Sequence, residues 1–171
     1  MDQLTQQRLK ELLSYDPITG VFTRLVALSN RNKVGEVAGS VYKSDGYRYI
    51  NVDGKRHPAH RLAWLYVHGK WPSGLLDHED MVGDHNAISN LRPADHSTNG
   101  ANRGVNANNS SGFKGVRPHK RKFLAKIKVK NQVINLGLHH TPEDAARAYD
   151  SAAITHFGNF ALTNRSLGLI T

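Results

Sequence analysis

Apolar side chains recur at three- and four-residue intervals in three stretches of the chain, a spacing typical of amphipathic helices. The first stretch covers residues 4–13 and stops before Pro17, and the second covers residues 60–69 and ends at Gly69. The third covers residues 141–157, and it begins with a threonine, a proline and two acidic residues. These residue types cap a helix N-terminus and complement its dipole, so they indicate that the third predicted helix begins at this point.

Short runs of alternating or β-branched residues predict strands between the helices. An Asp-Gly pair at 53–54 predicts a tight hairpin turn after one of these strands. The predicted strands cover residues 21–26, 46–52 and 75–78 in the first part of the chain, and 113–117, 122–129 and 132–138 in the second.

Both patterns are lost between Thr98 and Gly112, where Asn, Gly and Ser dominate. Such a composition favours turns and flexible connections over packed structure. We therefore expect a first domain over residues 1–102 with a strand-rich N-terminal region, a linker over 103–111, and a second domain over 112–171. The second domain is expected to be a small three-stranded antiparallel sheet with one helix on its back, which makes the chain an α+β protein.

Composition excludes several kinds of chemistry. The 171 residues include no cysteine, so disulfides, thiolate zinc sites and cysteine nucleophiles are ruled out. No apolar run approaches the roughly 20 residues of a membrane span, and the first residues lack the order of a secretory signal. We expect a soluble, cytoplasmic protein without a membrane partner.

The charge favours a polyanionic partner. The chain has 23 Lys and Arg against 14 Asp and Glu, a formal net charge of +9. The segment from His96 to Pro142 contains nine basic residues and no acidic one. A basic surface concentrated in this way is typical of proteins that bind nucleic acid.

Four polar residues between Leu75 and Asn99 form a candidate catalytic set. Phosphodiester hydrolysis needs a base that deprotonates water, a hard cation held by oxygen ligands, and a group that orients the base. The types required for these tasks are present as Asp77, His78, Asn90 and Asn99.

The spacing of Asp77-His78, Asn90-Leu91-Arg92 and Asn99 resembles the HNH endonuclease motif, and the segments around it resemble phage HNH homing endonucleases. The resemblance implies a ββα-metal architecture in which His78 is the general base and Asp77 and Asn99 bind one divalent ion. Asn90 would fix both the hairpin and the imidazole of His78. An all-oxygen ligand pair favours Mg²⁺ or Mn²⁺, and no zinc is expected.

The motif region departs from the family pattern in one place. Met81 stands where these proteins commonly have a glycine, so the loop after His78 is expected to differ in shape. No role is assigned at this level to Asp84, His85 or Asn86. His60 and Arg61, at the start of the second predicted helix, are expected to contact DNA near the cleaved bond.

Residues 110–164 resemble the APETALA2/ethylene-response-factor DNA-binding domain, above all in the segment AARAYDSAA. The resemblance implies that a three-stranded sheet enters the major groove with the helix packed behind it. Strand alternation agrees, because it separates the lysines of residues 122–130 from the apolar side chains between them. The expected DNA-binding residues of this domain are Lys114, Arg117, Lys120, Arg121, Lys122, Lys126 and Lys128.

These observations predict a metal-dependent HNH homing endonuclease, a phosphodiester hydrolase that cuts or nicks duplex DNA. We expect a monomer, located in the host-cell cytoplasm if a phage encodes it. Two alternatives remain open. One is a non-cutting DNA-binding regulator on an HNH scaffold, and the other is a relatively non-specific nuclease for DNA packaging or degradation.

Overall fold

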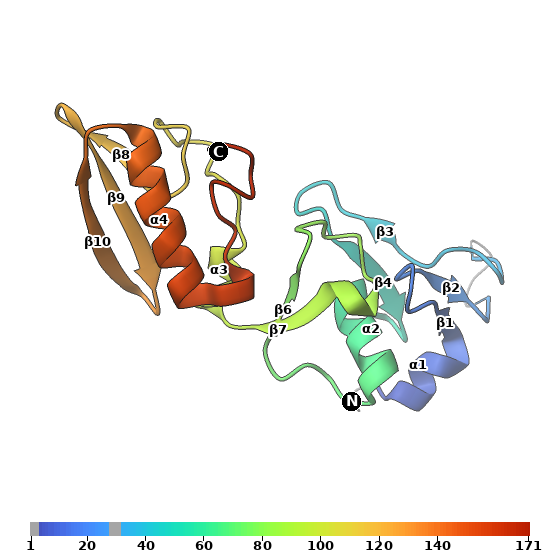
Figure 1. Cartoon of the computed structure of the whole chain (residues 1–171). Coiled ribbons are helices and arrows are strands. Elements are labelled where there is room, and N and C mark those ends of the chain that lie inside the picture. The colour runs from blue at the N-terminus through green and yellow to red at the C-terminus, as the bar shows by residue number, and fades with distance from the viewer. Residues whose placement is uncertain (1–3, 28–31) are drawn as a thin grey trace. The chain divides into compact units, whose positions relative to one another are not determined.

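The computed structural model describes residues 4–27 and 32–171, which divide into two compact units, residues 1–93 and 94–171 (Figure 1). The described residues form four α-helices and several small sheets, a mixed α/β composition. None of these helices has the length and apolar character needed to cross a membrane.

The first unit contains two helices and seven short strands among its described residues. They are α1 (Gln6–Leu12), β1 (Leu13–Tyr15), β2 (Phe22–Arg24), β3 (Ser40–Val41), β4 (Arg48–Val52), β5 (Lys55–Pro58), α2 (Ala59–His68), β6 (Leu75–His78), the 3₁₀ helix η1 (Ile88–Asn90) and β7 (Leu91–Ala94), whose last residue belongs to the second unit.

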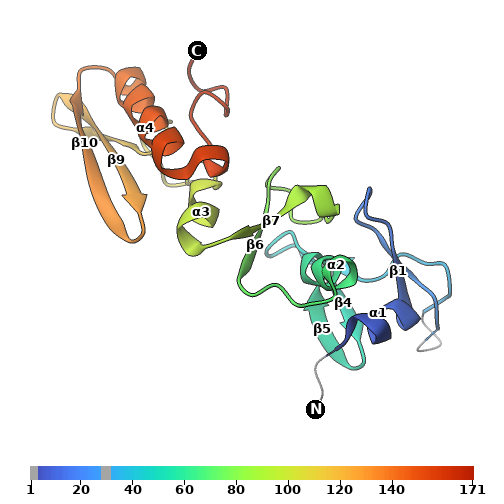
Figure 2. The same ribbon diagram turned by 60° about the horizontal axis from the view of Figure 1, so that its bottom comes forward.

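One apolar core holds most of this unit together. The strand β1 pairs antiparallel with β2, and β3, β4 and β5 form a second antiparallel sheet. The helix α2 packs against β4 and β5, as Figure 2 shows. The buried side chains that join α1, α2 and these strands include Leu9, Phe22, Ile50 and Leu62.

The main sequence predictions for this unit are confirmed. α1 begins after Thr5, whose side chain accepts a hydrogen bond from the Arg8 amide, and α2 ends at Gly69 with a φ of 73°. The predicted turn at residues 53–54 joins β4 to β5, with both residues at positive φ. Leu13 was expected in the first helix but starts β1, because its backbone pairs with that of Arg24.

The second unit is built on an antiparallel sheet in the order β10-β9-β8, with α4 packed against it (Figure 1). Alternate residues of β9 turn toward α4, so Ala125 and Ile127 are buried while Lys126 and Lys128 are exposed. The elements of this unit are α3 (His96–Ala101), β8 (Val116–His119), β9 (Lys122–Val129), β10 (Gln132–His139), α4 (Pro142–Phe157) and the 3₁₀ helix η2 (Gly158–Phe160).

The expectation of three strands and one helix is confirmed here, including the cap of α4 by Thr141 and its end at Gly158. The first strand lies later than expected, at 116–119 instead of 113–117. Gly115 adopts a φ of 75°, and its missing side chain leaves room for the Tyr149 ring, so the chain turns there before the strand starts.

The helix α3 belongs to the second unit. Asp95 caps it, Ala101 joins the apolar cluster around Ile127 and Tyr149, and the Ser97 hydroxyl accepts a hydrogen bond from the Lys130 amide. The division of the chain at Pro93 and Ala94 reflects these contacts. The domain limits expected from composition, with a linker over 103–111, stay a prediction.

Candidate functional site

The predicted Asp-His pair lies at the end of β6, which pairs with β7 in a two-stranded sheet. Leu75 and Leu76 supply the apolar start of this strand, and Asp77 and His78 are each only 4% exposed. Two adjacent polar side chains at this depth need partners, because burying an uncompensated charge or polar group is costly.

Arg92 on β7 pairs with Asp77. The Arg92 Nε lies 3.0 Å and a terminal guanidinium nitrogen 2.9 Å from Asp77 Oδ2, and a second terminal nitrogen lies 3.6 Å from Glu79. This cation keeps a buried carboxylate compatible with the charged state that metal binding requires.

His78 is held in a cage of polar and aromatic groups. Its Nε2 lies 3.1 Å from Oδ1 of Asn86, and its ring centroid lies 5.2 Å from that of His60 and 5.6 Å from that of Tyr47. Burial lowers the pKa of His78 below its ordinary value, and this effect outweighs the hydrogen bond with Asn86 and the nearby Asp80 and Asp77 carboxylates, which act in the opposite direction. The imidazole is therefore neutral near pH 7, as a general base must be.

Asn90 fixes the loop between β6 and β7. Its amide nitrogen donates to Asp80 Oδ1 at 2.9 Å and to the His85 carbonyl at 2.8 Å, while its Oδ1 accepts from the Asp80 amide. The expectation that Asn90 fixes the hairpin agrees with this geometry. The side chain that lies against Nε2 of His78 is that of Asn86, which the sequence argument left without a role, and the expectation that Asn90 also fixes the imidazole stays a prediction.

The side chains that had no assigned role hold this loop in place. Asp84 accepts two hydrogen bonds from Arg48, at 2.7 and 2.9 Å, and His85 pairs with Asp80. Gly83 lies so close to Gly46 that a Cβ there would come within 2.8 Å of the Gly46 carbonyl oxygen. Met81 takes a φ of 64°, the left-handed region that glycine adopts most readily, so the turn after His78 is built here with a non-glycine residue.

The expected contact of His60 and Arg61 with DNA stays a prediction, and the structure shows how each side chain is held. Burial lowers the pKa of His60 to about 3, so this ring is neutral, and its Nδ1 has no hydrogen-bond partner among the described residues. Arg61 donates to the carbonyls of Gly74 and Pro72, at 3.0 and 3.3 Å. These bonds fix the segment that leads into β6.

Asp77 and Asn99, the two expected metal ligands, lie on β6 of the first unit and on α3 of the second. Within the described part of the chain, no three His, Cys, Asp or Glu side chains gather as a metal cluster. A carboxylate and an amide oxygen suit a hard divalent cation, whose remaining coordination positions water and phosphate oxygens commonly fill.

Six of the expected DNA-binding residues are exposed, and we call them the basic surface. Lys126 and Lys128 lie on one face of β9, opposite Asn135 and Val133 of β10. No ion pair to a residue within 4–27 or 32–171 is found for any of the six. The basic surface consists of Arg117, Lys120, Arg121, Lys122, Lys126 and Lys128.

The buried position of Lys114 contradicts the expectation that this residue contacts DNA. The residue is buried at the lining of a groove in the second unit, where Nζ donates to the carbonyls of Ala101 and Leu162 and lies 5.9 Å from the centre of the Tyr149 ring. Burial lowers the pKa of this amine to about 8. The turn at Gly115 directs Lys114 inward, a reversal that strand alternation could not predict.

A groove of about 780 Å³ adjoins the basic surface within the second unit. The basic residues of its lining are Arg103, Lys114, Lys126, Lys128 and Lys130, and of these the sequence argument did not consider Arg103. Asp95 is the single acidic residue of the lining, and it is occupied as the cap of α3. The charge of Arg103 was visible in the sequence, but its position in the same groove as Lys126 and Lys128 was not.

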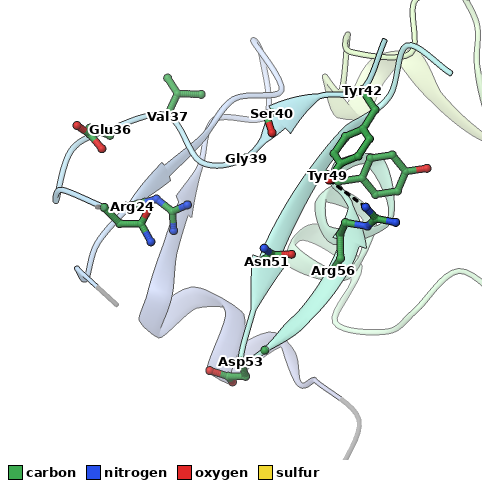
Figure 3. A pocket seen from close by; sticks show the side chains of 12 residues that line it. Arg24, Glu36, Val37, Gly39, Ser40, Tyr42, Tyr49, Asn51, Asp53 and Arg56 are labelled. Carbon is green, nitrogen blue, oxygen red and sulfur yellow. Dashed lines mark hydrogen bonds between the residues drawn. The ribbon is translucent and has the colours of Figure 1, made fainter. Parts of the chain in front are cut away.

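A second hollow, of about 600 Å³, lies over the sheet of the first unit (Figure 3). Arg56 stacks there on Tyr42 and Tyr49, with its guanidinium carbon 4.9 and 5.2 Å from the ring centres, and donates to the Tyr42 hydroxyl. None of the predicted catalytic or DNA-binding residues lines this hollow.

Residues 57–101 match the model of the HNH endonuclease family. The matched segment begins in β5, includes Asp77, His78, Asn86, Asn90 and Asn99, and ends with α3. Over this segment the chain is similar to HNH endonuclease domains, and HNH nucleases use divalent metal ions and act on DNA. A comparison with curated proteins gave no match.

Proposed function

We propose that this protein is a divalent-metal-dependent DNA endonuclease in which His78 is the general base. The observation that carries the proposal is a neutral, buried imidazole beside an arginine-paired carboxylate, inside the segment that matches the HNH family. Buried polar groups with perturbed pKa values are typical of active sites.

In the proposed reaction, a ring nitrogen of His78 takes a proton from water as the water oxygen attacks phosphorus. The bond from phosphorus to the 3′-oxygen then breaks, and the 3′-oxygen leaves with a proton from solvent. Arg92 holds the Asp77 carboxylate, and Asn90 keeps the loop between β6 and β7 closed around His78. A bound cation would neutralise the charge that develops on the phosphate and the departing oxygen.

We assign the metal to Asp77 and Asn99, and we propose Mg²⁺ or Mn²⁺. The support for this pair is its all-oxygen chemistry and the family match, which includes both positions. The order of β6, β7 and α3 along the chain is that of a ββα-metal site.

We further propose that the second unit binds duplex DNA through its sheet, as in the APETALA2-like domain that its sequence resembles. The support is the exposed charge of the basic surface and the groove beside it. An endonuclease with an added DNA-binding unit is suited to a homing function, in which cleavage depends on recognition of a site.

The proposal is tested by incubating supercoiled plasmid and phage DNA with the protein in Mg²⁺, in Mn²⁺ and in EDTA. We expect metal-dependent nicked or linear products, and a loss of about 10²–10⁴-fold in rate for His78→Ala, the range for removal of a general base. His140→Ala is the matched control, because His140 is an exposed histidine of the second unit.

Circular dichroism of each variant separates a lost fold from a lost base. Discrete fragments would support the homing assignment, whereas a smear would replace it with a non-specific nuclease. Binding without cleavage in either metal would favour a DNA-binding regulator, and equal activity of His78→Ala and wild type would remove His78 from the reaction.

A further inference from the structure

Asn86 lies beside His78, but the reaction proposed above gives it no role. It is only 1% exposed, and both ends of its amide are occupied. The amide nitrogen donates to the Asp84 carbonyl at 3.0 Å, and Oδ1 faces Nε2 of His78 at 3.1 Å.

The bond to Asp84 determines which way the amide points. A backbone carbonyl can only accept a hydrogen bond, so the group of Asn86 that faces Asp84 must be the NH₂ group. The group that faces His78 is then the carbonyl oxygen, which also can only accept. Nε2 of His78 must therefore carry a hydrogen in order to bond to it.

A neutral imidazole carries one hydrogen, bound to one of its two ring nitrogens. If that hydrogen is on Nε2, the lone pair is on Nδ1. The alternative tautomer would place the Nε2 lone pair against the Asn86 oxygen, which leaves two acceptors facing each other in a buried site. Leaving a buried polar group unsatisfied is costly enough to select one tautomer.

We propose that Asn86 is a positioning residue that fixes His78 as the Nε2–H tautomer, so that Nδ1 is the nitrogen that accepts the proton from water. The assignment of Nδ1 as the base rests on the proposed nuclease function. The assignment of the tautomer does not, because it follows from the hydrogen bonds alone.

The backbone of Asn86 is anchored as firmly as its side chain. Its carbonyl accepts a hydrogen bond of 2.7 Å from the Tyr15 hydroxyl, a contact between β1 and a loop 71 residues later. Gly20 packs against the same peptide so closely that a Cβ would come within 2.2 Å of the Asn86 carbonyl carbon. A group whose own position is determined by packing is suited to orient a catalytic base.

Nitrogen-15 NMR of the imidazole rings measures the tautomer directly. The full-length protein is labelled at its histidine ring nitrogens, without added metal, above neutral pH, and the His78 signals are assigned by their absence in His78→Gln. We expect a pyrrole-like shift for Nε2 and a pyridine-like shift for Nδ1. The opposite pattern in the wild type would overturn the proposal.

Two substitutions test the role of Asn86. Asn86→Leu removes the acceptor at similar volume, so the His78 ring is expected to lose its single tautomer and to show averaged shifts. Asn86→Asp keeps an acceptor toward Nε2, so the Nε2–H tautomer is expected to persist. Unchanged His78 shifts in folded Asn86→Leu would contradict the assignment.

Cleavage assays of the same variants test the consequence for catalysis. We expect kcat of Asn86→Leu to fall by about 10²–10⁴-fold, as expected when a base is removed or misoriented, with little change in KM. The kcat of Asn86→Asp should be at least tenfold higher than that of Asn86→Leu. Equal losses in both variants, together with an unchanged NMR pattern, would show a purely structural role.

The two readouts separate this proposal from the proposed function. If the wild type shows the Nε2–H tautomer but cleaves no DNA, the nuclease assignment fails and the tautomer assignment stands. If the wild type cleaves DNA but carries the hydrogen on Nδ1, the positioning role fails and the nuclease assignment stands.

Discussion

At the scale of single residues, the candidate active site shows how polar groups are placed inside a small protein. Asp77 and His78 are adjacent and equally buried, yet they have separate partners: Arg92 from β7 and Asn86 from the loop. The arginine compensates a charge, and the amide satisfies a neutral ring. The two compensations differ because the two side chains have different charge states in the fold.

Lys114 is another buried ionisable group whose hydrogen-bond partners are defined. Its amine serves two backbone carbonyls, one of them at the C-terminal end of α3. The fold therefore uses this lysine as a structural donor. Because burial disfavours the charged amine, the folded state is less stable whenever Lys114 is protonated than it would be with a neutral amine.

We expect this cost to appear in the pH dependence of stability. The folded pKa of Lys114 is about 8 and the unfolded value is 10.5, so between these pH values the unfolded chain binds more protons. The free energy of unfolding therefore rises with pH across this window. Below pH 8 both states are protonated, and the full cost of the buried charge is present.

Urea denaturation of the wild type and Lys114→Met at pH 7 and pH 10 measures the effect. The methionine variant lacks the titrating amine, so its destabilisation relative to the wild type should grow with pH. We expect a difference on the order of 1–2 kcal/mol, less than the full shift because the amine keeps some contact with solvent. A constant difference between the two curves would exclude the buried charge as the cause.

Residue roles were predictable from the sequence where the chemistry is local. The pairing of an acid with a histidine at residues 77 and 78 indicated the site, because only residue types and spacing were needed. The bond between Asn86 and His78 was not predictable, since it depends on how an eight-residue separation closes into a loop. The inward turn of Lys114 depends likewise on the left-handed backbone at Gly115.

At the scale of elements, the same distinction separates the strands and helices that could be predicted from those that could not. α4, β9 and β10 have strong local signals: a cap, a proline at the helix start, and long alternating runs. β1 and β3 have three and two residues, and they are strands because each pairs with the strand that follows it in the chain. Such strands carry too few residues for a pattern to be visible.

The element that fixes the loop before η1 is the turn between β1 and β2. Gly20 has a φ of 76° and lies against the backbone of Asn86 and Ala87. Any side chain at position 20 would meet backbone atoms, which cannot move aside as a flexible side chain can. The turn at Gly20 and the loop that carries Asn86 are therefore in direct backbone contact, so neither can shift without the other.

We expect Gly20→Ala to destabilise the protein and to reduce DNA cleavage, because the loop that carries Asn86 must shift. Gly35→Ala is the matched control, since Gly35 has a similar φ of 84° but no atom within 4 Å of its added Cβ. The control should cost about 1–3 kcal/mol for backbone strain alone. The test variant should cost roughly 1–3 kcal/mol more for overpacking.

Thermal and urea unfolding give the two free energies, and the cleavage rate of the folded fraction gives the functional effect. Similar stability losses in both variants would show that the peptide of Asn86 moves without cost, and that packing against Gly20 is not what holds the loop.

At the scale of the whole molecule, the uneven distribution of charge separates two tasks. The net charge of +9 is concentrated in the segment that forms most of the second unit, while the candidate base and its partners belong to the first. Chemistry and attraction to a polyanion are thus assigned to different sets of residues. Variants of each set should alter different kinetic parameters.

We expect the double variant Lys126→Ala, Lys128→Ala to raise the Kd for duplex DNA of every sequence and to leave kcat at saturating DNA unchanged. Each of these exposed lysines carries a compact charge on a flexible side chain, which suits phosphate binding. Their removal should therefore weaken electrostatic binding to DNA without disturbing the general base His78. The slope of log K against log salt should flatten by about 0.9 for each phosphate that is no longer neutralised, or roughly 1.8 for both. Fluorescence anisotropy over a salt series measures the slope, and the plasmid assay measures kcat.

Arg147→Ala with Arg165→Ala is the matched control, because it removes the same charge from exposed positions outside β9. An unchanged slope in the lysine variant would exclude this face from the DNA interface, and weaker binding confined to one DNA sequence would show that the lysines contact bases. If His78→Ala binds DNA as the wild type does while the lysine variant cleaves at the wild-type kcat, the two tasks are separable within this one chain.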